Sequence, residues 1–221
     1  MFYENKKNLY LLIVAIFLFA LNSFNIFYGT PMVPDQHWAQ KIFYLHVPSA
    51  WVGFLSYFIA MISGFLFLST KKDKWDITGT ACAEIGTLFM SLVLITGPIW
   101  ATPIWGKPWI WEPRLTTTLI LFLTYVGYFM MRSFGGNIER VKKTSAVIAI
   151  IAFLNVPIIF FSVQFWSPEL QSHPQVEMNQ QPTGILIPFL ISLFVFSFIF
   201  FVMLSYRKYV IFINKNLTNN V

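Results

Sequence analysis

The sequence predicts an all-α, polytopic membrane protein with six transmembrane helices and both termini in the cytoplasm. Three observations lead to this fold class: the composition, six long apolar runs, and the uneven placement of basic residues. Of 221 residues, 57% are hydrophobic and 11% are charged, whereas a soluble domain carries roughly a quarter of its residues charged. The mean hydropathy is +0.64. A compact soluble enzyme is therefore excluded, and a lipid bilayer is the expected surrounding.

Six runs of mainly apolar residues, separated by charges or by Pro and Gly clusters, define the expected spans. Each is close to the roughly 20 residues that a helix needs to cross about 30 Å of hydrocarbon. The fourth run is the shortest. We expect spans at residues 9–28, 47–68, 78–100, 115–131, 144–166 and 184–206, all within a single domain over residues 1–221.

The first span follows Lys6 and Lys7, as the apolar core of a secretory signal would, but no small-x-small cleavage site follows it. We interpret it as a retained membrane anchor. Six spans place both termini on one side of the membrane. The basic residues expected on that side number twelve: Lys6, Lys7, Lys71, Lys72, Lys74, Arg132, Arg140, Lys142, Lys143, Arg207, Lys208 and Lys215.

Only Lys41, Lys107 and Arg114 fall on the opposite side. The positive-inside rule then makes the termini cytoplasmic and places residues 29–46, 101–114 and 167–183 outside. This asymmetry also accounts for the net charge of +6 without a polyanionic ligand, so no nucleic acid is expected as a partner.

The single cysteine, Cys82, excludes a disulfide framework and a Cys-rich metal site, and it is expected to be a small buried residue. The sequence contains no G-x-x-x-x-G-K-[ST] loop, and the cytoplasmic connections are short. Any work driven by ATP would therefore need a partner protein.

The predicted outer face collects all three histidines and seven of the eight tryptophans. An aromatic belt at headgroup depth is one explanation, but a belt decorates both interfaces. The bias to one side favours a flat aromatic platform for a large planar ligand or a partner protein. Four tryptophans lie close together in the chain: Trp100, Trp105, Trp109 and Trp111.

These four tryptophans belong to residues 97–116, which also contain Gly106 and several prolines. Proline and glycine disfavour a regular helix, so we expect an outer loop or a partly re-entrant segment that ends where Leu115 starts the fourth span. Trp109 and Trp111 are two residues apart and would project to the same face of an extended backbone, with Lys107 beside them.

The run from Trp105 to Thr116, W-G-x-x-W-x-W-E-P-R-L-T, resembles the tryptophan-rich (WWD) signature of haem-handling membrane proteins, and most closely the haem exporter protein C (CcmC) family of cytochrome c maturation. The resemblance extends to His-Val-Pro-x-Ala-Trp at residues 46–51 and to Trp-Ser-x-x-x-x-x-His at residues 166–173. Two positions depart from the family: it usually has Asp in place of Glu112 and a small residue in place of Pro113.

The resemblance implies a b-type haem bound at the outer face. An iron with two axial imidazoles needs one nitrogen on each side of the porphyrin, and we expect His46 and His173 to supply them from opposing elements. His37 matches no ligand position of the family and is expected to be a structural or surface residue. The tryptophans and Glu112 would complete the site.

Cations are expected near the haem propionates, and Lys41, Lys107 and Arg114 are the candidates. Arg114 adjoins the tryptophan motif and is the best of the three, although all three residues could instead solvate loop ends. Glu84 falls inside the third predicted span, where a carboxylate is costly, and is a functional candidate by default. The sequence leaves its partner open between a helix dipole and a wet cavity.

The implied function is to bind haem at the outer face of a bacterial inner membrane and to deliver it to a periplasmic haem chaperone for cytochrome c biogenesis. The resemblance implies further partners: the subunits of an ATP-binding cassette transporter and a small single-span membrane subunit. The chain would position the haem and would have no hydrolytic or redox active site of its own. Two alternatives are a cofactor-free permease or channel subunit and a haem lyase that acts directly on apocytochrome c.

Overall fold

The structure is a computed structural model that describes residues 2–165 and 181–218, with side chains described for residues 8–162 and 181–217. Within these residues the regular secondary structure is helical, apart from one isolated bridge between Val33 and His37. The α-helices are α1 (Phe2–Phe24), α2 (Phe43–Thr70), α3 (Asp73–Trp105), α4 (Pro113–Phe134), α5 (Ile138–Phe153), α6 (Asn155–Phe165) and α7 (Thr183–Thr218). A π-helical turn η1 (Asn25–Gly29) and a 3-10 helix η2 (Trp38–Ile42) lie between α1 and α2.

Six helical segments in the described residues are long and apolar enough to cross a membrane. They occur where the apolar runs predict them, so the all-α class and the number of spans are confirmed. Several helices extend well beyond the predicted ends, since α3 has 33 residues and α7 has 36. A helix of 33 residues is about 50 Å long, more than the hydrocarbon core requires.

The fifth predicted span, residues 144–166, consists of two helices, α5 and α6, that meet at Leu154. The cause is Pro157, which has no N–H to bond the carbonyl of Phe153 and whose ring crowds that carbonyl. At the break, the Asn155 side-chain amide donates a hydrogen bond to the backbone carbonyl oxygen of Thr117 in α4, at 2.7 Å. The break is thus tied to the beginning of α4.

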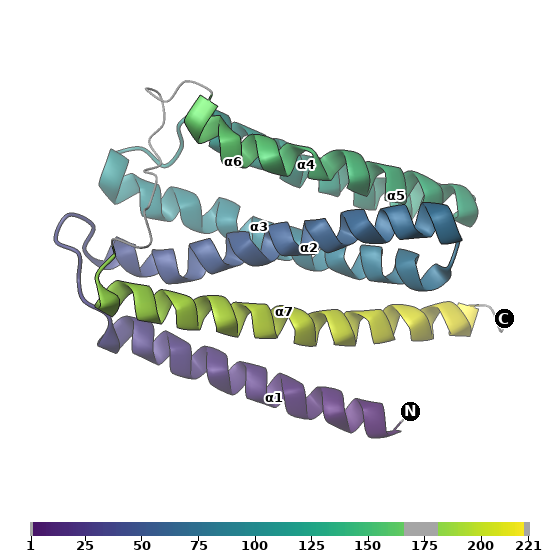
Figure 1. Ribbon diagram of the computed structural model, residues 1–221, viewed down its shortest axis with the longest axis horizontal. Helices are drawn as coiled ribbons and strands as arrows, with labels where there is room; N and C mark the ends of the chain where they lie inside the picture. Colours follow the sequence, from purple (N-terminus) through teal and green to yellow (C-terminus); the bar gives the residue numbers. More distant parts are fainter. Residues whose placement is uncertain (1, 166–180, 219–221) are drawn as a thin grey trace.

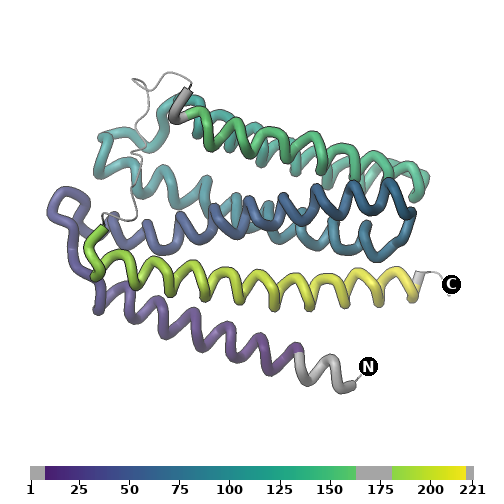
Figure 2. Tube along the Cα trace, viewed as in Figure 1, coloured from purple at the N-terminus to yellow at the C-terminus, as the bar shows by residue number. Residues whose placement is uncertain are grey.

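The helices run side by side as an elongated bundle (Figure 1). α2 and α3 form its centre, with α7 packed on both of them and α1 packed mainly on α7. On the other side, α5 packs on α2, and α4 packs on α5 and α6. The two termini lie at the same end of the bundle (Figure 2). We call this the terminal end, and we call the opposite end, which carries residues 25–42 and 106–112, the distal end.

Small residues allow the close approach of α2 to its neighbours. A Cβ added at Gly86 of α3 would lie 2.7 Å from the ring of Tyr57, and one added at Gly64 would lie 2.9 Å from the carbonyl oxygen of Ala146 in α5. Both separations are shorter than real Cβ contacts. Glycine is therefore required at both positions, as is common where membrane helices pack closely.

The middle of the bundle is filled by large side chains. The rings of Tyr57 and Tyr125 stack with their centroids 3.8 Å apart and an interplanar angle of 8°. Met90 and Phe200 are fully buried beside them in the same cluster, and so is Cys82, which confirms the prediction of a small buried residue.

Ion pairs join the helices at the terminal end. The guanidinium of Arg132 donates two hydrogen bonds to Asp76, at 2.8 and 3.2 Å, and so joins α4 to α3. Asp73 accepts from Lys142 at 2.9 Å and also from Lys215. Glu84, whose partner the sequence left open, pairs with Arg207 of α7, whose Nη2 lies 2.8 Å from Oε1.

Candidate functional site

The predicted site residues that the structure describes lie at the distal end, on three elements. His46 is in the first turn of α2, Trp100 and Trp105 are in the last turns of α3, and the other motif residues lie in the segment 106–112 or at the start of α4. His173 lies outside the described residues, as does Trp166. The pairing of His46 with His173 therefore stays a prediction.

His46 is half-buried against one face of α3. Its Nδ1 lies 2.9 Å from the hydroxyl oxygen of Thr96, and its ring meets that of Trp100 edge to face, with centroids 5.8 Å apart and an interplanar angle of 68°. The Cε1 atom lies 3.3 Å from where a Cβ of Gly97 would be. Three residues of one helix thus hold this imidazole.

Trp100 and Trp105 lie on a helix, and the expectation that the whole of residues 97–116 is irregular is wrong. α3 continues through Pro98 and Pro103 to Trp105. Each proline removes a single backbone donor, and an apolar surrounding penalises the loss of every other backbone hydrogen bond, so the helix persists.

Gly106 ends α3. It adopts the left-handed conformation, with φ of 68°, and its N–H donates to the carbonyl oxygen of Thr102 at 2.9 Å. Glycine adopts this conformation without the steric cost that other residues meet, and it commonly ends helices in this way. The irregular part of the motif is thereby limited to residues 106–112.

Trp109 and Trp111 are neighbours, but they do not form a flat surface. Their ring centroids lie 5.7 Å apart and their planes stand at 75°. Trp111 is 75% exposed, whereas Trp109 is half-buried and its Nε1 is a buried atom with no hydrogen-bond partner among the described residues. Trp111 is thus the more exposed ring of the pair, and Trp109 contacts it at a steep angle.

Glu112 and Pro113, the two departures from the family motif, form the beginning of α4. Pro113 is the first helical residue, where its fixed φ and missing N–H suit a helix. The carbonyl of Glu112 accepts the Thr116 N–H at 3.0 Å. The carboxylate does not cap the helix, and only 1% of Glu112 is exposed. Arg114 is half-buried two residues further on.

Lys41 is placed differently from the other two candidate cations. It is buried, and its ammonium donates to the carbonyl oxygens of Thr30, at 2.7 Å, and Pro31, at 3.5 Å, as well as to the Thr30 hydroxyl. It therefore joins η2, which leads into α2, to the end of η1. Lys107 is exposed beside the tryptophans, and it and Arg114 stay the candidates for a ligand's acidic groups.

His37 lies in an exposed turn before η2, where its φ is 46° and its N–H donates to the Val33 carbonyl at 2.8 Å. It does not join His46. Its neighbour Gln36 does contact the site, because the Trp100 Nε1 donates to the Gln36 Oε1 at 3.2 Å.

Sequence reasoning missed Thr96, Gly97 and Gln36 as neighbours of the site. A signal for Thr96 was available, since it lies four residues before Trp100 and so on the same face of a helix. Both residues fall within the predicted span 78–100. No signal in the sequence pointed to Gln36, whose contact depends on the course of the connection between α1 and α2.

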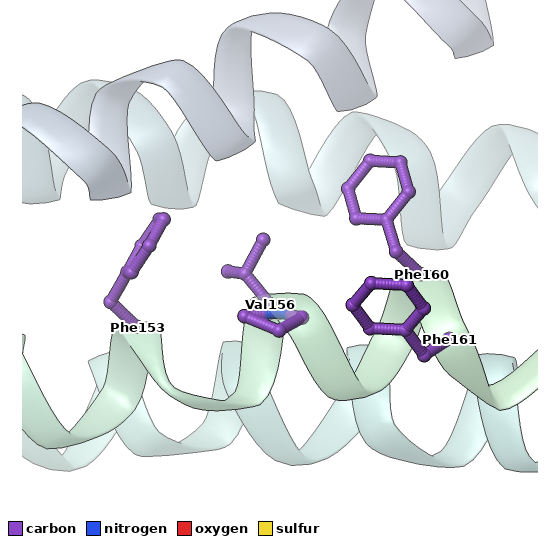
Figure 3. A pocket seen from close by; sticks show the side chains of 5 residues that line it. Phe153, Val156, Phe160 and Phe161 are labelled. Atoms are coloured by element: carbon purple, nitrogen blue, oxygen red, sulfur yellow. The ribbon is translucent and has the colours of Figure 1, made fainter.

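An apolar groove lies at the break between α5 and α6 (Figure 3). Its lining residues are Phe153, Val156, Pro157, Phe160 and Phe161. Phe153 and Phe160 also contact rings of α2, those of Phe58 and Phe54. These five side chains offer neither a metal ligand nor a charge, so the groove is not part of the candidate site.

A comparison with known families identifies the chain. The family model of CcmC, described as heme exporter protein C, matches residues 1–220. The chain belongs to the heme exporter protein C family. This member of the family is a multi-pass membrane protein with a tryptophan-rich distal end.

Individual relatives have similar names. The chain is 32% identical over 178 residues to the Heme exporter protein C of Bradyrhizobium diazoefficiens, covering 78% of this chain and 68% of that protein. It is 37% identical over 162 residues to a putative cytochrome c biosynthesis ccmC-like mitochondrial protein of Marchantia polymorpha, covering 73% and 67%. Identity to the Heme exporter protein C of Escherichia coli K12 is 30%, over 64% of this chain and 58% of that protein.

Proposed function

We propose that this protein binds haem at its distal end, on the periplasmic side of a bacterial inner membrane, and delivers it to a periplasmic haem chaperone for cytochrome c maturation. Haem is its cargo. The observation that carries the proposal is the placement of His46, held against Thr96 and Trp100 at the end of the bundle where the tryptophan-rich segment also lies. The names of the relatives, heme exporter and cytochrome c biosynthesis, support it.

The donor set at the distal end fits a haem. His46 would supply one axial nitrogen and His173 the other, which makes the bound group a bis-histidine b-type haem. The edge of Trp100 and the exposed ring of Trp111 offer aromatic surface to a porphyrin. Lys107 and Arg114 would neutralise the propionates, and Lys41 would not, since its ammonium is bonded to Thr30 and Pro31.

The role of this chain is to position its cargo. Imidazoles that hold the iron would leave the rest of the porphyrin to the aromatic side chains, and the exposed ring of Trp111 would give the chaperone a surface to bind. Holding the two partners together lowers the barrier to transfer by proximity. The connections at the terminal end are short, so ATP-dependent steps fall to partners: the subunits of an ATP-binding cassette transporter, with a small single-span membrane subunit.

The placement of charge supports the proposed orientation. Both termini lie at the terminal end (Figure 2), and so do Arg132, Lys142 and Arg207 with their acidic partners. A cytoplasmic terminal end satisfies the positive-inside rule and leaves the distal end in the periplasm. Labelling of Lys107→Cys in a Cys82→Ala background checks this. We expect labelling from the periplasm, and labelling from the cytoplasm alone would overturn the site.

The alternative of a solute pathway receives less support, because Tyr57, Met90, Tyr125 and Phe200 fill the middle of the bundle. The absorption spectrum of the purified protein decides between the two functions, since a bis-imidazole haem gives a characteristic band pattern. We expect His46→Ala and His173→Ala each to lower the haem content or change the spectrum, and added imidazole to restore the spectrum of His46→Ala. His37→Ala is the matched control. Equal loss in all three variants, or no haem in the native protein, would contradict the proposal.

A further inference from the structure

We propose that Thr96 is a positioning residue for the axial histidine, because its hydroxyl fixes the tautomer of His46. In this tautomer the proton is on Nδ1 and the lone pair is on Nε2, the nitrogen that would then ligate iron. The inference rests on the proposed function, in which His46 binds haem. It concerns a side chain that the tryptophan and histidine motifs do not include.

The argument begins with the single proton of the Thr96 hydroxyl. That hydroxyl donates to the backbone carbonyl oxygen of Leu92, four residues earlier in α3, at 2.7 Å. The same oxygen lies 2.9 Å from the His46 Nδ1. Since the proton is already directed to Leu92, the hydroxyl oxygen can only accept from the imidazole. Nδ1 must therefore carry a hydrogen.

A neutral imidazole carries one N–H, so a hydrogen on Nδ1 leaves Nε2 with the lone pair. Iron binds a nitrogen through that lone pair. Thr96 thus selects the form of His46 that is competent to bind through Nε2 before haem arrives. Only 8% of Thr96 is exposed, so water cannot easily replace the hydroxyl as acceptor.

The neighbours of Thr96 fix the plane of the same ring. Gly97 lies under Cε1, where an added Cβ would be 3.3 Å away, and the Trp100 ring meets the imidazole at 68°. These three positions, i, i+1 and i+4, share one face of α3. Threonine determines which nitrogen carries the proton, while glycine and tryptophan determine where the ring lies.

The tautomer itself can be measured in the haem-free protein. We would record nitrogen NMR shifts of ¹⁵N-histidine-labelled protein in detergent and assign His46 by its loss in His46→Ala. The native protein is expected to hold His46 with the proton on Nδ1. Thr96→Val keeps the shape of the side chain but removes the acceptor, so the protonated-Nε2 form should increase. Thr96→Ser keeps the hydroxyl and should restore the native tautomer.

The second readout is the rate at which haem leaves the protein for an excess of apomyoglobin. Loss of a partner that orients a metal-binding histidine typically weakens binding about 10-fold or more, so Thr96→Val should release haem about 10-fold faster, with Thr96→Ser close to native. Thr124→Val is the matched control, because Thr124 makes the same bond to a carbonyl four residues earlier, at 2.8 Å, in α4. It should leave both readouts unchanged.

The outcomes separate this inference from the proposed function. If His46→Ala retains its haem, the proposed function fails. If His46→Ala loses haem while Thr96→Val keeps both the native tautomer and the native release rate, the role of Thr96 is overturned and the function stands. A native His46 with its proton on Nε2 would also overturn it. Should Thr96→Val not fold, Thr96→Ala provides the same test without the second methyl group.

Discussion

The two ends of the bundle hold their polar groups in different ways. At the terminal end, Asp73, Asp76, Glu84 and Glu139 each pair with a lysine or an arginine. At the distal end the side-chain contacts of the described residues are mainly between neutral groups, such as His46 with Thr96 and Trp100 with Gln36, and even the ammonium of Lys41 bonds carbonyl and hydroxyl oxygens.

From this difference we expect the terminal end to serve mainly the stability of the fold and the distal end to serve mainly ligand binding. The acidic and basic side chains at the terminal end neutralise one another in ion pairs that join α3, α4, α5 and α7. Paired charges of this kind bind a further ligand weakly. The neutral contacts at the distal end orient an imidazole and an indole, and Lys107 is exposed beside them in the chain. A substitution at one end should therefore change a property that a substitution at the other end leaves alone.

The largest expected effect is the loss of bound haem in His46→Ala. Loss of an axial ligand should lower the haem content at least about 10-fold, since even partners that only orient a ligand contribute that much. The thermal midpoint of the haem-free protein should change little, because His46 is only half-buried. Haem content by absorption and thermal unfolding in detergent measure the two properties. A variant that lost stability in proportion to haem would remove the distinction between the two ends.

The next largest effect is expected from Asp76→Asn at the opposite end. It leaves the guanidinium of Arg132, now paired through two hydrogen bonds, without its counter-charge in a mostly buried position. The cost is about 2 kcal/mol of stability, seen as a lower thermal midpoint, while the folded fraction keeps its haem spectrum. Asp35→Asn, in the exposed loop before η2, is the control and should not shift the midpoint.

A smaller effect is expected at Trp111. This ring is 75% exposed, so Trp111→Ala should scarcely alter stability or the coordination spectrum but should slow transfer of haem to the chaperone. Each ring contact contributes roughly 1 to 3 kcal/mol, and Trp111→Phe should be milder. Stopped-flow transfer to the purified chaperone gives the rates. Normal transfer by a Trp105, Trp109 and Trp111 triple alanine variant would mean that these rings form only an interfacial belt.

Glu112→Asp should have the smallest effect. It restores the residue that the family usually has and keeps the charge, so haem content should stay within about twofold, a difference of less than 1 kcal/mol. Glu112→Gln removes the charge from a residue that is 1% exposed and should have the larger effect of the two if that charge serves the site. A native haem content in Glu112→Gln together with a loss in Glu112→Asp would show that size, and not charge, is what this position requires.

The sequence predicts the fold well because membrane spans follow from local composition. A run of about 20 apolar residues is sufficient to predict a span, and all six were found. Helix ends were predicted less well, since α3 and α7 extend past the hydrocarbon, where hydropathy no longer marks a helix. Pro98 and Pro103 led to the wrong expectation of an irregular segment. They weaken α3, but an apolar surrounding and the packing on α2 maintain the helix.

For the candidate site, the sequence motifs single out His46, Trp100, Trp105, Trp109 and Trp111. The structure places them at the distal end, and their role in binding stays a prediction. The pairing of Glu84 with Arg207 joins residues 123 positions apart, and the contact between His46 and Thr96 spans 50. No local pattern contains such contacts, because they depend on how α2, α3 and α7 lie against one another.

The packing of α1 on α7 has a consequence for the order of assembly during synthesis. Asn22 of α1 donates to the hydroxyl of Ser192 in α7, 170 residues later, at 3.1 Å, and both side chains are buried. The buried partner of Asn22 is therefore synthesised 170 residues after it. Until α7 is inserted, the amide of Asn22 has no Ser192 to bond within the hydrocarbon, where a lone polar group is costly. This contact can form only after α7 has been synthesised, and a chain truncated before Ser192 would leave α1 without its main packing surface.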